Sequence, residues 1–315
     1  MALSGLEDPD FKLIFLGGKG GVGKTSCAVA TAIKLSERFR TLLISTDPAH
    51  SVSDSLEQPI GSRLQKVKGV DSLSAVEIGA DEAFEVFKRQ HQEELEKLFD
   101  TSSSLDNDDI SQLLSLSIPG IDEMMGLKTI MDLIEEHNFE KYVVDTAPTG
   151  HVLRLLSSPK ILDQWIKVAV QMRWKYRYMV TRFSGSYHPD NTDDILLKLK
   201  KATKHIEELL KDSKRCEFIS VCIPESMAVR ETERLLTDLK KSGILVRQLI
   251  INHVMELGTC HFCLRKKESQ QKYLNRIEEI SGMHLAITKV PSFSEEIKGI
   301  EQLNMLKKVL FGHSD

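Results

Sequence analysis

The sequence lacks an excess of positive charge and any long apolar run. Its 46 aspartates and glutamates outnumber its 42 lysines and arginines, which leaves a net charge of −4. This balance, without a basic tail, argues against binding to nucleic acid or to a membrane surface through charge. No run reaches the roughly 18 uncharged apolar residues of a membrane span, so no transmembrane helix is expected.

The sequence also lacks two features that are typical of secreted proteins, a signal peptide and a disulfide framework. The first ten residues, MALSGLEDPD, have neither the basic region nor the apolar region of a signal peptide. The five cysteines are an odd number, and only Cys260 and Cys263 are closely spaced, so no disulfide framework is expected. We therefore expect a soluble cytoplasmic protein.

What the sequence does have is a regular alternation of short apolar runs and amphipathic segments. Strands are expected at residues 11–16, 41–45, 73–78, 142–145, 218–223, 249–254 and 284–290. Most of these runs lack polar alternation, which is typical of parallel strands covered on both faces. Amphipathic helices are expected at residues 24–38, 225–242 and 266–281. The pattern predicts an α/β fold with a doubly wound, mostly parallel sheet.

The segment FLGGKGGVGKTS, residues 15–26, contains a phosphate-binding motif. It fits G-x-x-x-x-G-K-[ST], follows an expected strand and opens an expected helix, which is the context that the motif needs. Glycines let backbone N–H groups surround phosphate oxygens at the positive end of the helix. Lys24 is expected to bind the β- and γ-phosphates of ATP, and Thr25 to ligate Mg²⁺. The expected nucleotide-binding residues of this P-loop are Gly18, Lys19, Gly20, Gly21, Val22, Gly23, Lys24, Thr25 and Ser26.

Two aspartates follow or end expected strands, in the stretches LLISTDPAHS and YVVDTAPTGH. Carboxylates at the carboxyl ends of parallel strands lie where α/β sheets bind ligands. Asp145 is therefore expected to hold Mg²⁺, directly or through water, and Asp47 to orient or deprotonate the attacking water. The alternative is that both aspartates are helix caps or turn residues.

Lys19 is a second lysine in the motif, and at its position it points away from its own phosphate cradle. It is either a solvated loop residue or a residue that reaches a partner subunit's nucleotide. In the second case it stabilises transition-state charge, as an arginine finger does. That interpretation requires a dimer whose two nucleotide sites face each other.

Two gaps of about sixty and about seventy residues interrupt the alternation, before and after the expected strand at 142–145. A single crossover helix needs far fewer residues. Both gaps read as helical, so they predict one helical subdomain inserted at two points. The expected nucleotide-binding domain comprises residues 1–80, 138–157 and 215–315, and the expected insertion comprises residues 81–137 and 158–214.

The expected insertion carries apolar stripes at helical spacing that are rich in methionine. Methionine adapts to varied apolar shapes, which suits a groove that accepts many partners. The alternative is that the stripes pack on one another as a helical core. The residues expected to line a groove are Met124, Met131, Met172 and Met179.

The segment CHFC places Cys260 and Cys263 at the spacing of zinc ligands. A structural zinc site takes four ligands, so the pair is half of a site. A second copy of the chain across a two-fold axis would supply the two missing thiolates, and His261 is an alternative ligand. Two free surface thiols are the alternative to a metal site.

These motifs resemble those of a known family. GKGGVGKT resembles the deviant P-loop ATPases with a signature lysine, and STDPAHS and DTAPTGHVLRLL narrow the resemblance to the arsenical-pump ATPase superfamily. PGIDEMM, ETERLL, INHV, the C-x-x-C pair, QQKYL and VPSFSEEIKGIEQL are similar to its branch that targets tail-anchored membrane proteins. The resemblance extends from residue 11 to about residue 310.

The resemblance implies a homodimeric ATPase that uses ATP and Mg²⁺. It further implies that the protein carries membrane proteins with one carboxyl-terminal transmembrane helix to a membrane receptor, and it favours a client groove over a helical core. Lys19 matches the signature lysine, Asp47 the catalytic aspartate of switch I, and Asp145 the aspartate of switch II. Cys260 and Cys263 match a pair that binds one Zn²⁺ per dimer.

The resemblance also implies an adenine site. Asn252 matches the asparagine that recognises adenine, and the loop with Pro291 and Phe293 matches the adenine-side loop. An asparagine amide offers a donor and an acceptor, as reading an adenine edge requires, but alone it is equally typical of a turn.

An ATPase subunit of an arsenite or antimonite efflux system is the alternative function. That branch typically fuses two such halves and uses dispersed cysteines, whereas this chain has one half and a close cysteine pair. A DNA-partition ATPase is disfavoured by the acidic net charge and the large insertion. The sequence leaves open whether dimers pair into tetramers.

Overall fold

The structure, a computed structural model, divides into two compact units. It describes residues 3–47, 51–79, 121–146, 191–256, 260–282 and 284–312, and single residues at 83, 85, 86, 89, 167, 174, 178, 181, 182 and 258. The first unit comprises Met1–Gly79, Leu133–Leu153 and Leu210–Asp315, and the second comprises Ala80–Asp132 and Arg154–Leu209. The assignment of these parts to a nucleotide-binding domain and a helical insertion stays a prediction.

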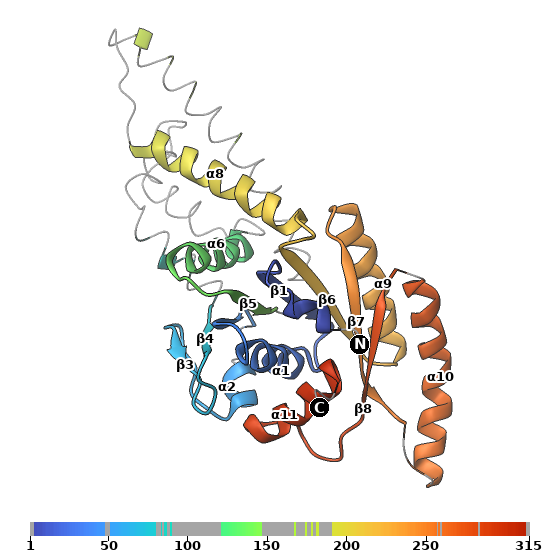
Figure 1. Cartoon of the computed structure of the whole chain (residues 1–315). Coiled ribbons are helices and arrows are strands. Elements are labelled where there is room, and N and C mark those ends of the chain that lie inside the picture. Colours follow the sequence, from blue (N-terminus) through green and yellow to red (C-terminus); the bar gives the residue numbers. More distant parts are fainter. Residues whose placement is uncertain are drawn as a thin grey trace. The chain divides into compact units, whose positions relative to one another are not determined.

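One sheet of eight strands forms the centre of the first unit, in the order β3-β4-β2-β5-β1-β6-β7-β8 (Figure 1). All neighbouring strands are parallel except β3 and β4. The mostly parallel α/β class is therefore confirmed. The strands are β1 Leu13–Gly18, β2 Thr41–Ser45, β3 Gln65–Lys66, β4 Leu73–Glu77, β5 Lys141–Asp145, β6 Cys216–Cys222, β7 Val246–Val254 and β8 Ala286–Pro291.

The strand ends differ from the sequence expectation where pairing, rather than side-chain pattern, decides them. Strand β1 continues through Gly17 and Gly18 because these residues pair with Ser220 and Val221 of β6. Strand β3 was not expected, since two residues at the edge of a sheet are too few to show a pattern.

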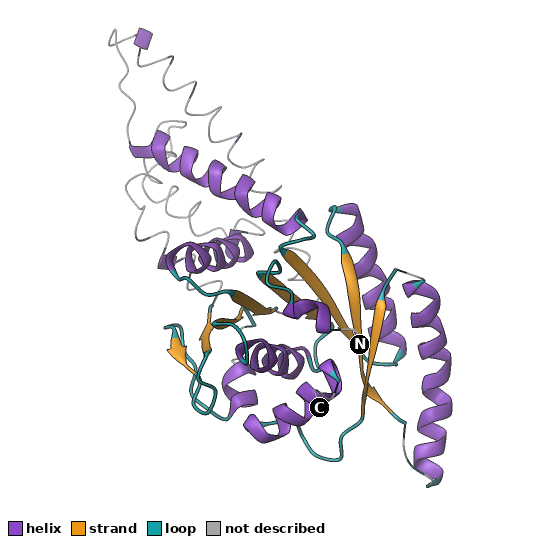
Figure 2. Ribbon diagram, in the orientation of Figure 1, coloured by secondary structure: helices purple, strands orange, loops and turns teal. Residues whose placement is uncertain are grey.

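Helices cover the sheet of the first unit (Figure 2). Helix α1 packs against α2 and α11 and against strands β1, β2 and β5. Leu249 and Ile251 of β7 cluster with residues of α9 and α10, whereas Ile250 belongs to a cluster with residues of α1 and α11. Because alternate residues of a strand point to opposite faces, β7 is covered on both sides. These elements are α1 Lys24–Ser36, α2 Ser51–Leu56, α9 Ser226–Lys241, α10 His261–Ser281, α11 Gly299–Phe311 and the 3₁₀ helix η1 Ser4–Glu7.

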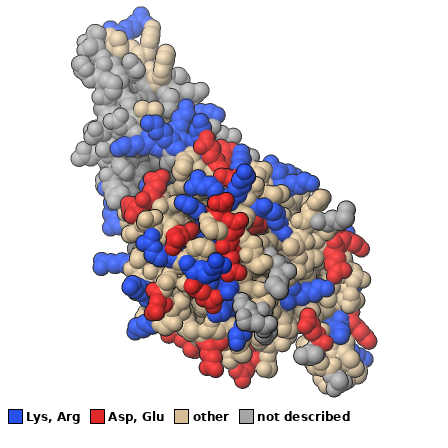
Figure 3. Space-filling model, in the orientation of Figure 1, with Lys and Arg blue, Asp and Glu red and all other residues tan. Residues whose placement is uncertain are grey.

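Most of the second unit's described backbone belongs to helices α6, Ile121–Glu136, and α8, Asn191–Lys211. Two of the expected groove residues, Met124 and Met131, belong to α6. No described helix combines the length and the apolar character that crossing a bilayer requires. Acidic and basic side chains are interspersed over the face of the first unit seen in Figure 3.

Candidate functional site

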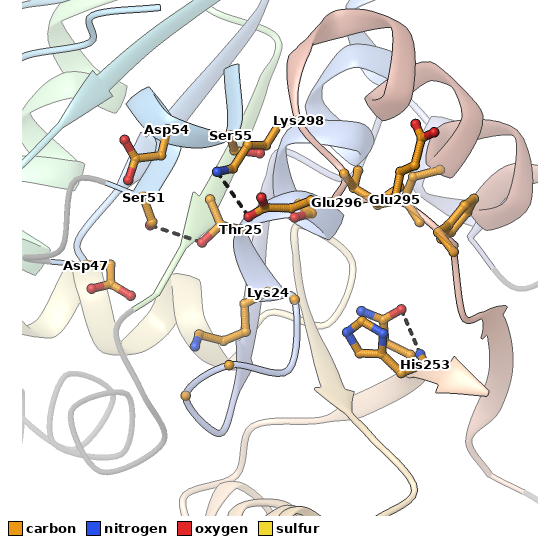
Figure 4. Close-up of a pocket in the computed structure, with 18 residues that line it drawn as sticks. Lys24, Thr25, Asp47, Ser51, Asp54, Ser55, His253, Glu295, Glu296 and Lys298 are labelled. Carbon is orange, nitrogen blue, oxygen red and sulfur yellow. Dashed lines mark hydrogen bonds and ion pairs between the residues drawn. The ribbon is translucent and has the colours of Figure 1, made fainter. Parts of the chain in front are cut away.

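A pocket of about 460 Å³ lies at the carboxyl ends of the sheet strands, where open α/β sheets bind ligands (Figure 4). Asp47 and Ser51 lie on one side of Lys24, and His253 lies on the other. The predicted residues that line the pocket are Gly20, Gly21, Gly23, Lys24, Thr25, Ser26, Asp47, Asn252 and Phe293. The predicted residues outside the lining are Gly18, Lys19, Val22, Asp145 and Pro291.

The glycines of the P-loop meet two different geometric demands. Gly18 ends β1 so close to β6 that a Cβ atom would lie 2.1 Å from the Val221 carbonyl oxygen. Gly23 precedes α1 with a φ of 88°, in the left-handed region that other residues rarely adopt. The loop can therefore turn directly from strand to helix and leave the first N–H groups of α1 facing the pocket.

Lys24 is buried at the start of α1, and its Nζ donates to the carbonyl oxygen of Lys19 at 3.3 Å. Burial lowers the pKa of Lys24, although the nearby Asp145 and Asp47 carboxylates act in the opposite direction. The lysine thus curls back on its own loop, within reach of the anions that the loop would bind.

Three oxygen-bearing side chains converge beside the loop. The Thr25 hydroxyl donates to Asp145 Oδ2 at 2.8 Å and lies 3.0 Å from Ser51 Oγ. Asp145 is fully buried, and among the described residues its Oδ1 has no hydrogen-bond partner. Burial raises the pKa of Asp145 to about 7, while the Thr25 hydrogen bond and the Lys24 charge oppose that shift. A buried carboxylate with an unpaired oxygen next to two hydroxyls fits a hard divalent cation such as Mg²⁺.

Asn252 makes contacts on the P-loop side of the pocket. Its Nδ2 donates to the Val22 carbonyl oxygen at 3.0 Å, and its Oδ1 accepts the His253 N–H at 2.9 Å. A Cβ atom on Gly23 would lie 2.3 Å from Asn252 Nδ2, so the side chain rests directly on the loop. The predicted role in reading adenine stays a prediction, but the same amide also holds the loop.

Several residues that line the pocket were given no role from the sequence. Ser51, Asp54 and Ser55 come from helix α2. Glu296 and Lys298 form an ion pair of 3.0 Å in the loop after β8. Ser51 ends the motif STDPAHS, and Glu296 and Lys298 lie within VPSFSEEIKGIEQL, so position within a motif is the signal that could have found these three. Asp54 and Ser55 lie outside both motifs.

The two close cysteines lie at the start of helix α10. Cys260 Sγ and Cys263 Sγ are 3.1 Å apart, and the Cys263 N–H donates to Cys260 Sγ at 3.3 Å. The hydrogen bond from Cys263 lowers the pKa of the Cys260 thiol. Within the described part of the chain, no group of three or more His, Cys, Asp or Glu side chains is arranged to hold a metal. The pair therefore offers two convergent sulfur ligands, which is half of a tetrahedral zinc set.

Comparison with known proteins agrees with the pocket's chemistry. A sequence model of the anion-transporting ATPase family matches residues 11–312. The chain belongs to this family. It is 35% identical to a protein named ATPase ASNA1 homolog 2 from Paramecium tetraurelia, over 97% of this chain and 95% of that protein. It is 34% identical to a protein named ATPase get3 from Schizosaccharomyces japonicus, over 97% of this chain and 94% of that protein.

Membership of this ATPase family accounts for the phosphate loop but leaves the predicted client groove untested. Met131 is buried, with 5% of its surface exposed. The side chain of Met124, and all of Met172 and Met179, lie outside the described residues. Trp174 and Tyr178, which lie between Met172 and Met179 in the sequence, are 70% and 61% exposed.

Proposed function

We propose that the chain is a homodimeric, Mg²⁺-dependent cytoplasmic ATPase that binds the carboxyl-terminal transmembrane helix of tail-anchored membrane proteins and delivers them to a membrane receptor. The observation that carries the ATPase is the contact between the Thr25 hydroxyl and the buried Asp145 carboxylate, beside Lys24 and Asp47. The sequence motifs and the relatives named ASNA1 and get3 support the targeting role.

The pocket residues divide the work of hydrolysis. Thr25 and Asp145 would hold Mg²⁺, which neutralises charge on the β- and γ-phosphate oxygens when it is bound. Lys24 would exchange the Lys19 carbonyl for phosphate oxygens. Asp47, on the pocket wall, would orient or deprotonate the attacking water.

ATP turnover by the Asp47→Asn variant tests this assignment. Asparagine keeps the size of the side chain but cannot act as a base, so turnover should fall by roughly 10²-fold or more, while ATP binding survives. Lys24→Ala should instead weaken ATP binding itself. Asp54→Asn is the matched control, because Asp54 lines the same pocket but is exposed and has no assigned role. Near-normal turnover of Asp47→Asn would refute the assignment.

Capture of a client helix tests the targeting role separately. Met172→Asp combined with Met179→Asp should abolish capture of an apolar carboxyl-terminal helix and leave basal ATPase activity and dimerisation intact. The matched control is Lys167→Asp, since Lys167 is exposed and is not among the methionines expected to line the groove. If the two sets behave alike, or if the methionine variants unfold, the stripe is an internal core.

An arsenite or antimonite efflux ATPase has less support, because the relatives named above are ASNA1 and get3 ATPases. Stimulation of the wild-type ATPase by arsenite or antimonite, without binding of client helices, would favour the pump.

A further inference from the structure

We infer that Glu77 is a positioning residue that holds helix α2 in place, so that the Ser51 hydroxyl serves as a further oxygen ligand of the nucleotide's divalent cation. The inference rests on the proposed function, because it concerns the Mg-nucleotide that the pocket would take. Glu77 does not line the pocket, and neither sequence motif nor resemblance assigns it a role.

Glu77 ends strand β4 and is 3% exposed. Its Oε1 accepts the N–H groups of Val52 and Ser53 at 3.0 and 3.1 Å, and its Oε2 accepts the Ser53 hydroxyl at 3.2 Å. The first N–H groups of a helix have no partner within the helix, and negative charge at that end is favourable. The Glu77 carboxylate on β4 therefore accepts hydrogen bonds from two N–H groups in the first turn of α2.

Glu77 and Ser53 also form hydrogen bonds with the segment that follows α2. The Ser53 hydroxyl shares its one proton between Glu77 Oε2 and the Ile60 carbonyl, which lies at 2.9 Å, and it accepts the Ile60 N–H at 3.0 Å. The Glu77 N–H donates to the Gly61 carbonyl at 3.0 Å. A helix of six residues is too short to be stable alone, so its position depends on these bonds and on packing of the buried Val52.

Ser51 is the first residue of α2, and its hydroxyl faces the cation cluster. Ser51 Oγ lies 3.0 Å from Thr25 Oγ1 and 3.5 Å from Asp145 Oδ2. Three oxygens from α1, α2 and β5 thus converge at one place, and oxygen atoms are the ligands that a hard divalent cation such as Mg²⁺ prefers.

A second observation points to a ligand at this place. Asp145 Oδ1 is buried without a hydrogen-bond partner among the described residues, whereas Oδ2 of the same carboxylate contacts the Thr25 and Ser51 hydroxyls. A buried carboxylate oxygen left unpaired is costly, and a cation bound by the cluster would remove that cost. Displacing α2 would move Ser51 away while leaving Thr25 and Asp145 in place, since these belong to other elements.

Binding of Mn²⁺ to the ADP complex of the full chain, followed by electron paramagnetic resonance, tests the inference without using activity. Ser51→Ala and Glu77→Gln should each weaken Mn²⁺ binding by about tenfold or more, the size of loss that removal of an outer-shell partner causes. The affinity for ADP without metal should stay within about twofold of wild type. Glu77→Asp, which keeps the charge, should recover part of the loss.

Glu217→Gln is the matched control for removing a buried carboxylate. Glu217 is 2% exposed and forms an ion pair of 3.0 Å with Arg247. It lies near the amino end of β6, whereas the pocket lies at the carboxyl ends of the strands. This variant should lower the melting temperature and leave Mn²⁺ affinity unchanged.

Two results would overturn the inference. One is a Ser51→Ala chain that binds Mn²⁺·ADP as wild type does, and the other is a Glu77→Gln chain that loses only thermal stability, as Glu217→Gln does. If Glu77→Gln does not fold, Ser53→Ala removes the hydroxyl contacts with Glu77 and Ile60 and leaves the carboxylate in place, and wild-type Mn²⁺ affinity there also counts against the inference. A wild-type chain that fails to bind ADP with Mn²⁺ refutes the proposed function instead.

Discussion

The nucleotide pocket and the cysteine pair differ in how much of each site one chain supplies. Thr25, which lines the pocket, is 120 residues away in sequence from Asp145 and forms a hydrogen bond with it. At the start of α10, Cys260 and Cys263 converge, but the described chain adds no third ligand beside them. One chain thus brings the groups of the pocket together, whereas the cysteine pair supplies only two of the four ligands that a structural zinc site takes.

The contrast follows from how each site is built. A parallel sheet brings distant strand ends to one edge, so a single chain can assemble several different functional groups there. The cysteine pair is formed by one turn of chain at a helix start, and four neighbouring residues cannot surround a tetrahedral metal. A short motif such as this C-x-x-C pair therefore predicts only two of the four ligands of a structural zinc site.

Replacing both cysteines tests the incomplete site and should have the largest effect. Cys260→Ser with Cys263→Ser should remove one zinc per two chains and shift the protein from dimer to monomer, because structural zinc contributes about 10–16 kcal/mol in small peptides. Metal analysis and sedimentation of the purified protein measure both outcomes. One zinc per chain in the wild type would instead mean a complete site within one subunit, with His261 as a candidate ligand.

Mixed dimers test whether the pocket is complete after all. If Lys19 acts on the partner's nucleotide, inactive Lys19→Ala and inactive Asp47→Asn chains should complement each other when mixed. Half of the dimers would be mixed and each would have one working site, so about a quarter of wild-type turnover should return. No recovery, with mixed dimers shown to form, would mean that Lys19 works within its own chain.

Lys141 forms another set of contacts within one chain, and its replacement should have an effect of intermediate size. Its Nζ is buried and donates to the carbonyl oxygens of Leu6, Asp8 and Phe11, which fixes the amino-terminal segment. Lys141→Met leaves three carbonyls without their donor and should cost about 3 kcal/mol of stability. Lys12→Met, at an exposed lysine of the same segment, should change stability by less than about 0.5 kcal/mol. Equal effects of the two variants in chemical unfolding would contradict the anchoring role.

The anchor also predicts a pH dependence. Burial lowers the pKa of Lys141 from 10.5 to about 8. Because the folded pKa is the lower one, the unfolded chain binds more protons between pH 8 and 10.5, and the contribution of Lys141 to stability rises with pH in that window. The difference in melting temperature between wild type and Lys141→Met should therefore widen from pH 7.5 to pH 10.

Lys141 also shows what the sequence could not reveal. The P-loop and Asp145 were predictable, because their residue types at a strand end have a chemical meaning of their own. The partners of Lys141 are backbone carbonyls more than 100 residues away, which leave no trace in the sequence pattern. Nor could Ser51 or Glu77 be assigned, because their importance depends on contacts between α2 and two strands.

The fold was predictable for a similar reason. Apolar runs such as 41–45 are set by burial on both faces, and strand β2 matches that range. Helix α10 begins at His261, five residues before the expected start, because Cys260 caps it with its sulfur. Helix caps and strand pairing determine where a helix or strand ends, whereas the burial of its apolar side chains determines whether it forms.

Replacing Asn252 should have the smallest effect. It tests whether this residue supports the P-loop, binds the adenine, or does both. Asn252→Ala removes the hydrogen bond to the Val22 carbonyl and should weaken ATP binding by about tenfold, which corresponds to about 1.4 kcal/mol. Pyrophosphate has no base, so its affinity separates the two roles of the amide. A similar loss for pyrophosphate means that Asn252 acts mainly by bracing the P-loop. A loss for ATP alone, with preference for ATP over GTP reduced, means that the amide serves the adenine and that the brace adds nothing to phosphate binding.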